Sequence, residues 1–142
     1  MTTEIRPELS ENNKYHISKH RYYELLHFCR QYTDWLTEKE NILNTCVRPH
    51  VTPDKVKAVV SFVENIPTEK FAIKLADVDD KIKLIEQTAV DADEQLSGYI
   101  LMSVTSGLGF DAMKARYDVP CSRNTFYDRY RKFFWILDQR RR

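Results

Sequence analysis

Residues 119–137 constrain the fold more than any other part of the chain. Pro120 cannot lie inside a helix, whereas the Ser122 side chain can cap a new helix by accepting a backbone N–H two or three residues further on. Apolar residues then recur at intervals of three and four, which is the spacing of one buried helix face. These residues are Phe126, Tyr130, Phe133, Phe134 and Leu137. The sequence therefore predicts a helix over Ser122–Leu137 with an aromatic core side.

The composition of the chain favours an all-α fold. Only three Gly and five Pro occur in 142 residues, and the apolar fraction of 42% is ample for a core. No apolar run approaches the length of a membrane span, and no signal-peptide pattern opens the chain. Three Cys without paired spacing fit a reducing compartment. We therefore expect an all-α protein of the cytoplasm that does not act at a membrane.

Helix-start signals divide the chain into three predicted regions. Residues 1–17 are polar and are expected to form a flexible arm. Residues 18–90 are expected to form a helical N-terminal region whose first helix continues to about Leu43. Helices in this region begin at three residues that can act as caps, namely Ser18, Thr52 and Thr68. We expect these N-terminal helices to pack against the third region.

Residues 91–142 form that third region, a predicted tri-helical helix-turn-helix. Asp91 followed three residues later by Glu94 resembles a capping box, so we expect a helix to begin there. Gly107 is expected to end this helix in the left-handed conformation. A short helix over Phe110–Tyr117 and a tight connection then lead into the final helix, which is the order of elements in a helix-turn-helix.

Charge is distributed unevenly along the chain. Residues 1–94 contain 13 Lys and Arg against 17 Asp and Glu, which gives a net charge of −4. Residues 95–142 contain 9 Lys and Arg against 4 Asp and Glu, which gives a net charge of +5. Because a polyanion binds where positive charge gathers, we expect double-stranded DNA to bind the C-terminal region.

The polar side of the final helix supplies the candidate DNA contacts. In the major groove, which admits an α-helix, arginine can bond guanine and asparagine can bond adenine. The predicted base contacts are Ser122, Arg123, Asn124, Tyr127 and Arg131. The predicted phosphate contacts, which position a protein without reading sequence, are Lys114, Arg116, Arg129, Lys132, Arg140 and Arg141. The alternative for the Arg140–Arg142 tail is a frayed, solubilising chain end.

Roughly the last 50 residues resemble a known protein family. The resemblance lies in Tyr99-Ile100, Gly107, Phe110, Val119-Pro120, Ser122, Thr125-Phe126-Tyr127 and Arg131-Lys132-Phe133. This pattern is similar to that of the RinA- and ArpU-like late transcription regulators of phages and prophages of Gram-positive bacteria, whose helix-turn-helix resembles region four of sigma factors. The resemblance implies that Phe110–Tyr117 is the supporting helix and Ser122–Leu137 the recognition helix, and that the protein acts inside a bacterial host cell.

Catalytic and metal chemistry find little support in the sequence. No nucleophile–base arrangement, phosphate-binding loop or dinucleotide motif is present, so we expect neither an enzyme nor a cofactor. His16 and His20 are four residues apart but lack further ligands at the spacing of a metal site. For Cys121, a thiol of lowered pKa is the alternative to a simple packing role.

An acidic helix face supports a second hypothesis. Asp77, Asp79 and Asp80 can dock a basic surface of RNA polymerase or another host protein. The chain would then be a phage-encoded, protein-binding inhibitor of a host nucleic-acid enzyme, of the anti-CRISPR or RNA-polymerase type. A small terminase-like packaging subunit is a third hypothesis. A homodimer would add contacts that one short recognition helix lacks, and Trp135, which lies off the apolar stripe, is a candidate contact for it.

Overall fold

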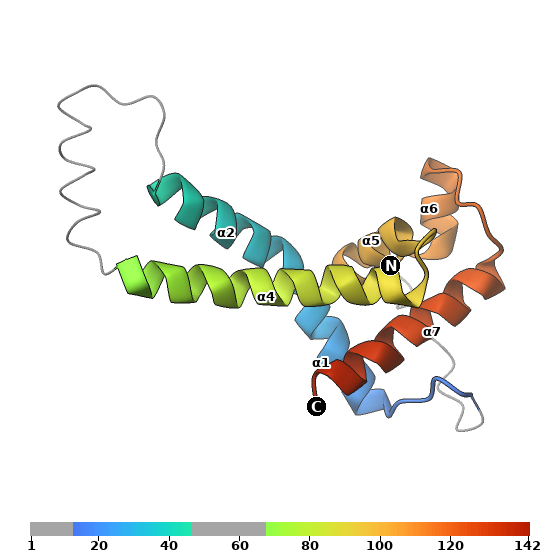
Figure 1. The fold of residues 1–142 in the computed structure, drawn as a ribbon. Helices are drawn as coiled ribbons and strands as arrows, with labels where there is room; N and C mark the ends of the chain where they lie inside the picture. The colour runs from blue at the N-terminus through green and yellow to red at the C-terminus, as the bar shows by residue number, and fades with distance from the viewer. Residues whose placement is uncertain (1–12, 47–67) are drawn as a thin grey trace. The chain divides into compact units, whose positions relative to one another are not determined.

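The computed structural model describes residues 13–46 and 68–142 of the chain. Every regular element within these ranges is an α-helix, which confirms the predicted all-α class (Figure 1). The helices are α1 (Lys19–Arg30), α2 (Tyr32–Cys46), α4 (Thr68–Ala92), α5 (Ser97–Ser106), α6 (Phe110–Arg116) and α7 (Arg123–Arg140). The helix predicted to begin at Thr52 lies outside the described residues. None of the helices in the described ranges is both long and apolar enough to cross a membrane.

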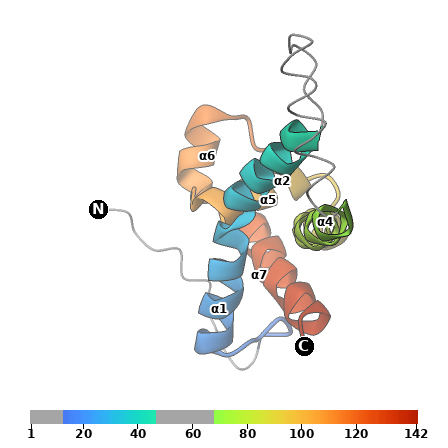
Figure 2. The same ribbon diagram turned by 90° about the vertical axis from the view of Figure 1, so that its left-hand side faces the viewer.

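Packing divides the chain into two compact units. The first comprises Met1–Tyr32 and Leu84–Arg142, and the second comprises Thr33–Lys83. The division differs from the predicted boundary between residues 90 and 91, because α1 packs against α5 and α7 (Figure 2). Helix α4 contributes to both units, since Lys83 and Leu84 are neighbours inside it.

Aromatic side chains join α1, α6 and α7 in the core of the first unit. The predicted apolar stripe of α7 is confirmed, with all five of its residues buried. The ring of Tyr22 on α1 meets Phe134 edge-on at 4.9 Å between centroids, and its hydroxyl shares a hydrogen bond of 2.9 Å with that of Tyr130. The centroid of the Phe110 ring on α6 lies 5.7 Å from that of the Phe126 ring on α7. Each aromatic pair of this kind contributes about 1 kcal/mol beyond the burial of its area.

The long first helix expected from Ser18 to about Leu43 is two helices. Ser18 caps α1 as predicted, because its side chain accepts a hydrogen bond of 3.2 Å from the Arg21 backbone N–H. Helix α1 ends at Arg30, and α2 begins at Tyr32. At Gln31 the backbone N–H donates to the Phe28 carbonyl at 3.2 Å, a tightened turn typical of helix ends.

The predicted capping box at Asp91 and Glu94 is wrong. Helix α4 continues through Asp91 to Ala92, and α5 begins only at Ser97. Asp93 fills the expected role, because its Oδ1 accepts hydrogen bonds from the backbone N–H groups of Gln95 and Leu96 at 3.0 and 3.1 Å. An aspartate stabilises such a turn when its side chain accepts hydrogen bonds from the backbone two and three residues further on. Asp91 and Asp93 lie close enough in sequence for either to be a candidate.

Gly107 ends α5 in the left-handed conformation, as the sequence predicts. Its φ is +83°, and its N–H donates to the Ser103 carbonyl at 2.9 Å. A Cβ atom built on Gly107 would lie 2.9 Å from a guanidinium nitrogen of Arg30. The position therefore favours glycine mainly because of its positive φ. A second reason is that a Cβ atom would lie too close to Arg30.

The C-terminal turn of α7 is tied to the rest of the first unit. Arg21 donates from Nε to Asp138 Oδ1 at 2.7 Å and from a terminal nitrogen to the Arg141 carbonyl at 3.1 Å. The Arg141 guanidinium lies 3.6 Å from the centroid of the Phe28 ring. Burial would raise the pKa of Asp138, but hydrogen bonds from Arg21 and Arg142 outweigh it and lower the pKa. The end of the chain is therefore part of the fold.

Replacement of Gly107 by alanine should destabilise the protein by about 1–2 kcal/mol, because alanine is strained at positive φ. Gly98→Ala is the matched control: nothing lies within 4 Å of its Cβ, and alanine favours a helix by about 0.5 kcal/mol there. Urea unfolding followed by circular dichroism measures both variants. Equal midpoints for the two would contradict the assignment of Gly107.

A lower pH should weaken the ion pair between Arg21 and Asp138. A carboxyl group whose pKa is lowered by folding stabilises the fold above its unfolded pKa of about 3.9, and this stabilisation is lost as the pH falls through the folded value. At pH 7, Asp138→Asn should cost about 2 kcal/mol, and the difference from the wild type should shrink below about pH 4. Urea unfolding at several pH values measures it, and a difference independent of pH would refute this role of Asp138.

Candidate nucleic-acid interface

The connection between α6 and α7 is fixed at both of its ends. Val119 is fully buried, and its carbonyl accepts a hydrogen bond of 2.8 Å from Lys114 Nζ on α6. Ser122 then caps α7 as predicted, because its side-chain oxygen accepts from the Thr125 backbone N–H at 3.2 Å. Buried and hydrogen-bonded connections hold the helices that they join, so the first turn of α7 has a defined orientation with respect to α6.

The first turns of α7 expose polar side chains opposite the aromatic core. Ser122, Asn124 and Thr125 are exposed, and Asp128 is partly exposed. Asn124 and Asp128 are four residues apart, which places them on one side of the helix. Thr125 and Asp128 were absent from the predicted contacts. Their distance from the apolar stripe around the helix was the signal that could have identified them.

Arg123 remains accessible at the start of α7. Its side chain is 64% exposed, with one guanidinium nitrogen 3.6 Å from Asp111 Oδ2 on α6. The guanidinium also lies 5.7 Å from the centroid of the Tyr127 ring. An ion pair this exposed contributes at most about 1 kcal/mol, so a phosphate or a guanine can compete for the arginine.

Tyr127, one of the predicted base contacts, has a role within the fold. Its hydroxyl accepts a hydrogen bond of 3.2 Å from the Phe110 backbone N–H. The cap residue of α6 is Gly109, which has no side chain to accept that hydrogen bond. The Tyr127 ring also lies 5.3 Å from Phe126 in an edge-on contact. Tyr127 therefore caps α6 from α7 and positions the two helices relative to each other.

Two of the predicted phosphate contacts, Arg129 and Arg140, are paired with acids of the first unit, and a third, Arg141, lies on an aromatic ring. Arg129 Nε lies 3.3 Å from Asp93 Oδ2, an ion pair without hydrogen-bond geometry. Arg140 donates to the Thr88 hydroxyl at 3.0 Å and pairs with Asp91, and Arg141 lies on Phe28. Arg140 and Arg141 therefore contact the rest of the unit, although the Arg141 guanidinium has no acidic partner in the described ranges.

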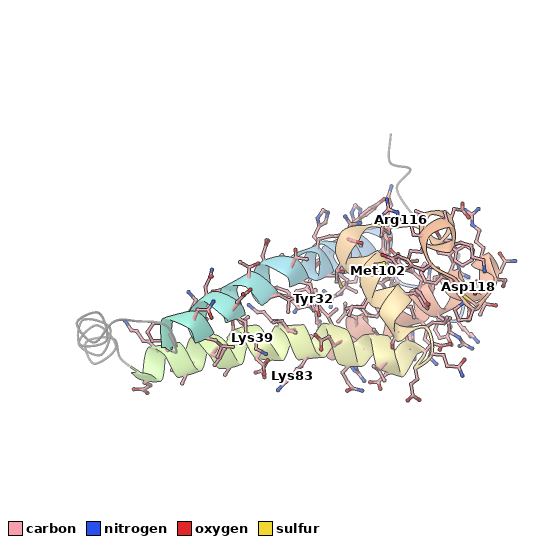
Figure 3. The ribbon with its side chains drawn as sticks, turned by 90° about the horizontal axis from the view of Figure 1, so that it is seen from above. Tyr32, Lys39, Lys83, Met102, Arg116 and Asp118 are labelled. Atoms are coloured by element: carbon pink, nitrogen blue, oxygen red, sulfur yellow. The ribbon has the colours of Figure 1, made fainter. Side chains whose placement is uncertain are left out.

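Apart from Arg141, the predicted phosphate contacts without an acidic partner lie along α6 and the first half of α7. In the part of the chain that the structure describes, no acidic partner is found for Lys114, Arg116, Arg131 or Lys132. Arg116 is at the exposed end of α6, close in sequence to Asp118 (Figure 3). Arg131 is half-buried, and its Nε has no hydrogen-bond acceptor. Positive charge without an acidic partner therefore gathers on α6 and the first half of α7.

Net charge leads to the same conclusion. The described residues of the first unit, 13–32 and 84–142, include 13 Lys and Arg against 9 Asp and Glu, a net charge of +4. Part of the surplus in residues 95–142 is thus balanced by acids earlier in the chain, among them Asp91 and Asp93. The described residues of this unit therefore keep most of the positive surplus seen in residues 95–142.

The acidic face of α4 is largely paired with lysines of the second unit. Asp79 lies 2.6 Å from Lys39 Nζ and 2.7 Å from Lys83 Nζ, and Lys39 and Lys83 are marked in Figure 3. The hydrogen bond from Lys39 is the main cause that lowers the pKa of Asp79. Asp77 is paired with Lys81 at 3.1 Å. Because Asp77 and Asp79 are already paired with lysines, less negative charge is available to a partner than the sequence suggests.

Thiol and metal chemistry gain no support from the geometry. Burial raises the pKa of Cys121, against a smaller lowering effect of Lys114, so a reactive thiolate is not favoured at this position. Burial raises the pKa of Cys29 as well. Over residues 13–46 and 68–142, no three His, Cys, Asp or Glu side chains are grouped as a metal site.

Removal of the Tyr127 hydroxyl tests the capping role. Tyr127→Phe should destabilise the protein by about 1 kcal/mol, because the Phe110 N–H loses its acceptor. Tyr117→Phe is the control, since Tyr117 is 45% exposed at the other end of α6. Urea unfolding in the absence of DNA measures the free energy of unfolding of both variants. If Tyr127→Phe were as stable as the control, the hydroxyl would have no role in the fold.

Comparison with known proteins adds no assignment. A scan against protein-family models, a search of curated proteins and a search of solved structures each find no match. The resemblance to RinA- and ArpU-like regulators is therefore an expectation from sequence, and any function has to be argued from the residues themselves.

Proposed function

We propose that the protein is a sequence-specific DNA-binding regulator of transcription, of phage or prophage origin, and that α7 enters the major groove. The observation that carries the proposal is the start of α7, where Ser122, Arg123, Asn124 and Thr125 are exposed while the opposite side is anchored by aromatic residues. A helix that exposes short polar side chains and an arginine at its N-terminal end suits the edges of base pairs.

Base reading is assigned to the exposed side of α7. Asn124 can bond adenine through two hydrogen bonds, and Arg123 can bond guanine in the same way. Thr125 and Asp128 lie next to them, and an aspartate can accept a hydrogen bond from the amino group of cytosine. Tyr127 acts on recognition indirectly, because it holds α6 in place.

Phosphate binding is assigned to the cations without acidic partners. Lys114 and Arg116 lie on α6, and Arg131 and Lys132 lie farther along α7. Cations on both sides of an inserted helix meet the backbones that border the groove, and these contacts orient the helix without reading sequence. Because a single helix contacts few bases, we expect high affinity to require a second copy of the chain.

The alternative, a protein-binding inhibitor of a host nucleic-acid enzyme, has less support. It rests on Asp77, Asp79 and Asp80, and two of these three carboxylates are paired with lysines. Within residues 33–46 and 68–83, no contact favours a basic protein surface over water. RNA polymerase as a partner has the same weak basis, so duplex DNA is the partner that we propose.

Fluorescence anisotropy with labelled duplex DNA across a salt series tests the proposal. Each neutralised phosphate contributes about −0.9 to the slope of log affinity against log salt concentration. Arg131→Gln and Lys132→Gln should each make the slope shallower by about 0.9, because each removes a cation that has no acidic partner. Lys70→Gln, on the exposed surface of the second unit, should leave the slope unchanged.

Arg140→Gln separates this assignment from the one based on sequence alone. It should lower stability and leave the salt slope unchanged, because Arg140 bonds Thr88 and Asp91. A slope made shallower by Arg140→Gln would return this residue to the interface. Binding that is undetectable at low salt for the wild-type protein would overturn the proposed function itself.

A further inference from the structure

Residues 13–17, expected to belong to a flexible arm, form an ordered segment of the first unit. The Asn13 side chain accepts a hydrogen bond of 2.9 Å from the Tyr15 backbone N–H, and the Asn13 carbonyl accepts one of 3.0 Å from that of His16. Ile17 is only 7% exposed, and Ser18 then caps α1. The segment is therefore held by a turn at one end and by a buried side chain at the other.

The same segment lies against α7. The ring of Tyr15 packs on that of Trp135 with 5.7 Å between centroids. Lys14 Nζ lies 4.9 Å from the centroid of the Tyr15 ring. Trp135 follows Arg131 by four residues and Lys132 by three, so it shares a side of α7 with both. The contact of Tyr15 with Trp135 therefore brings the Lys14 ammonium group to the side of α7 where two unpaired cations lie.

The Lys14 ammonium group has no acidic partner among the described residues. The Lys14 side chain is exposed. An aromatic ring attracts an ammonium group but does not neutralise it, so the group can still bind an anion. Sequence spacing gave no sign of this arrangement, because residues 14 and 135 meet only in the fold.

We propose that Lys14 is a phosphate contact of the DNA interface, held beside Arg131 and Lys132 by the packing of Tyr15 on Trp135. The proposal rests on the function proposed above and extends its interface to a segment that precedes α1. It also gives Trp135, which lies off the buried stripe of α7, a role as the platform for this segment in place of a dimer contact.

The test is the salt dependence of binding of labelled duplex DNA by the full-length protein. Lys14→Gln should make the slope shallower by about 0.9, the contribution of one phosphate. Tyr15→Ala should cause the same loss although Lys14 is still present, because the ammonium group is no longer held on α7. Lys19→Gln removes an exposed lysine from the start of α1 and should leave the slope unchanged. Circular dichroism of each variant checks that it is folded.

The outcomes separate this inference from the proposed function. A wild-type slope for Lys14→Gln, in a protein that binds DNA with a steep slope, would overturn the contact and leave the proposed function intact. A wild-type slope for Tyr15→Ala would overturn the role of the Tyr15–Trp135 packing. Equal losses for Lys14→Gln and Lys19→Gln would show a general effect of charge and would also refute a specific contact. Absence of DNA binding by the wild-type protein would refute both proposals.

Discussion

The packing of α1 against α7 through Tyr22, Tyr130 and Phe134 is the contact on which the rest of the first unit depends. It buries large aromatic surfaces from two helices that are far apart in sequence, and it satisfies the two hydroxyl groups with each other. Burial raises the pKa of Tyr130, so its hydroxyl stays protonated within this hydrogen bond. Because one side of α7 is held in this way, its opposite side is free to present polar residues.

Local signals were enough to predict much of this fold. Ser18, Ser122 and Gly107 act where the sequence placed them, because a cap or a left-handed residue depends only on its near neighbours. The α7 stripe was predicted for the same reason. The capping box at Asp91 failed because Asp93 competes for the same turn. The two compact units do not follow the boundary predicted at residue 90, because α1 packs with helices distant in sequence.

Residues of the candidate interface were harder to predict, because side-chain partners are distant in sequence. Tyr127 bonds an amide 17 residues away, and Arg140 bonds groups 49 and 52 residues away. No spacing rule reports such partners, so a structural arginine and a DNA-contacting arginine look alike in the sequence. The structure distinguishes the two kinds by their partners. The predicted contacts without acidic partners that are assigned to phosphates lie around α6 and in the first half of α7.

Amide chemical-shift changes in the NMR spectrum on addition of duplex DNA test the central claim most directly, because they locate binding residue by residue. The account predicts changes concentrated in the first turns of α7, around Lys114 and Arg116, and at Lys14, with little change around Lys39 and Lys83. Changes confined to residues 33–83, or no change at low salt, would contradict the assignment of α7 as the DNA-contacting helix.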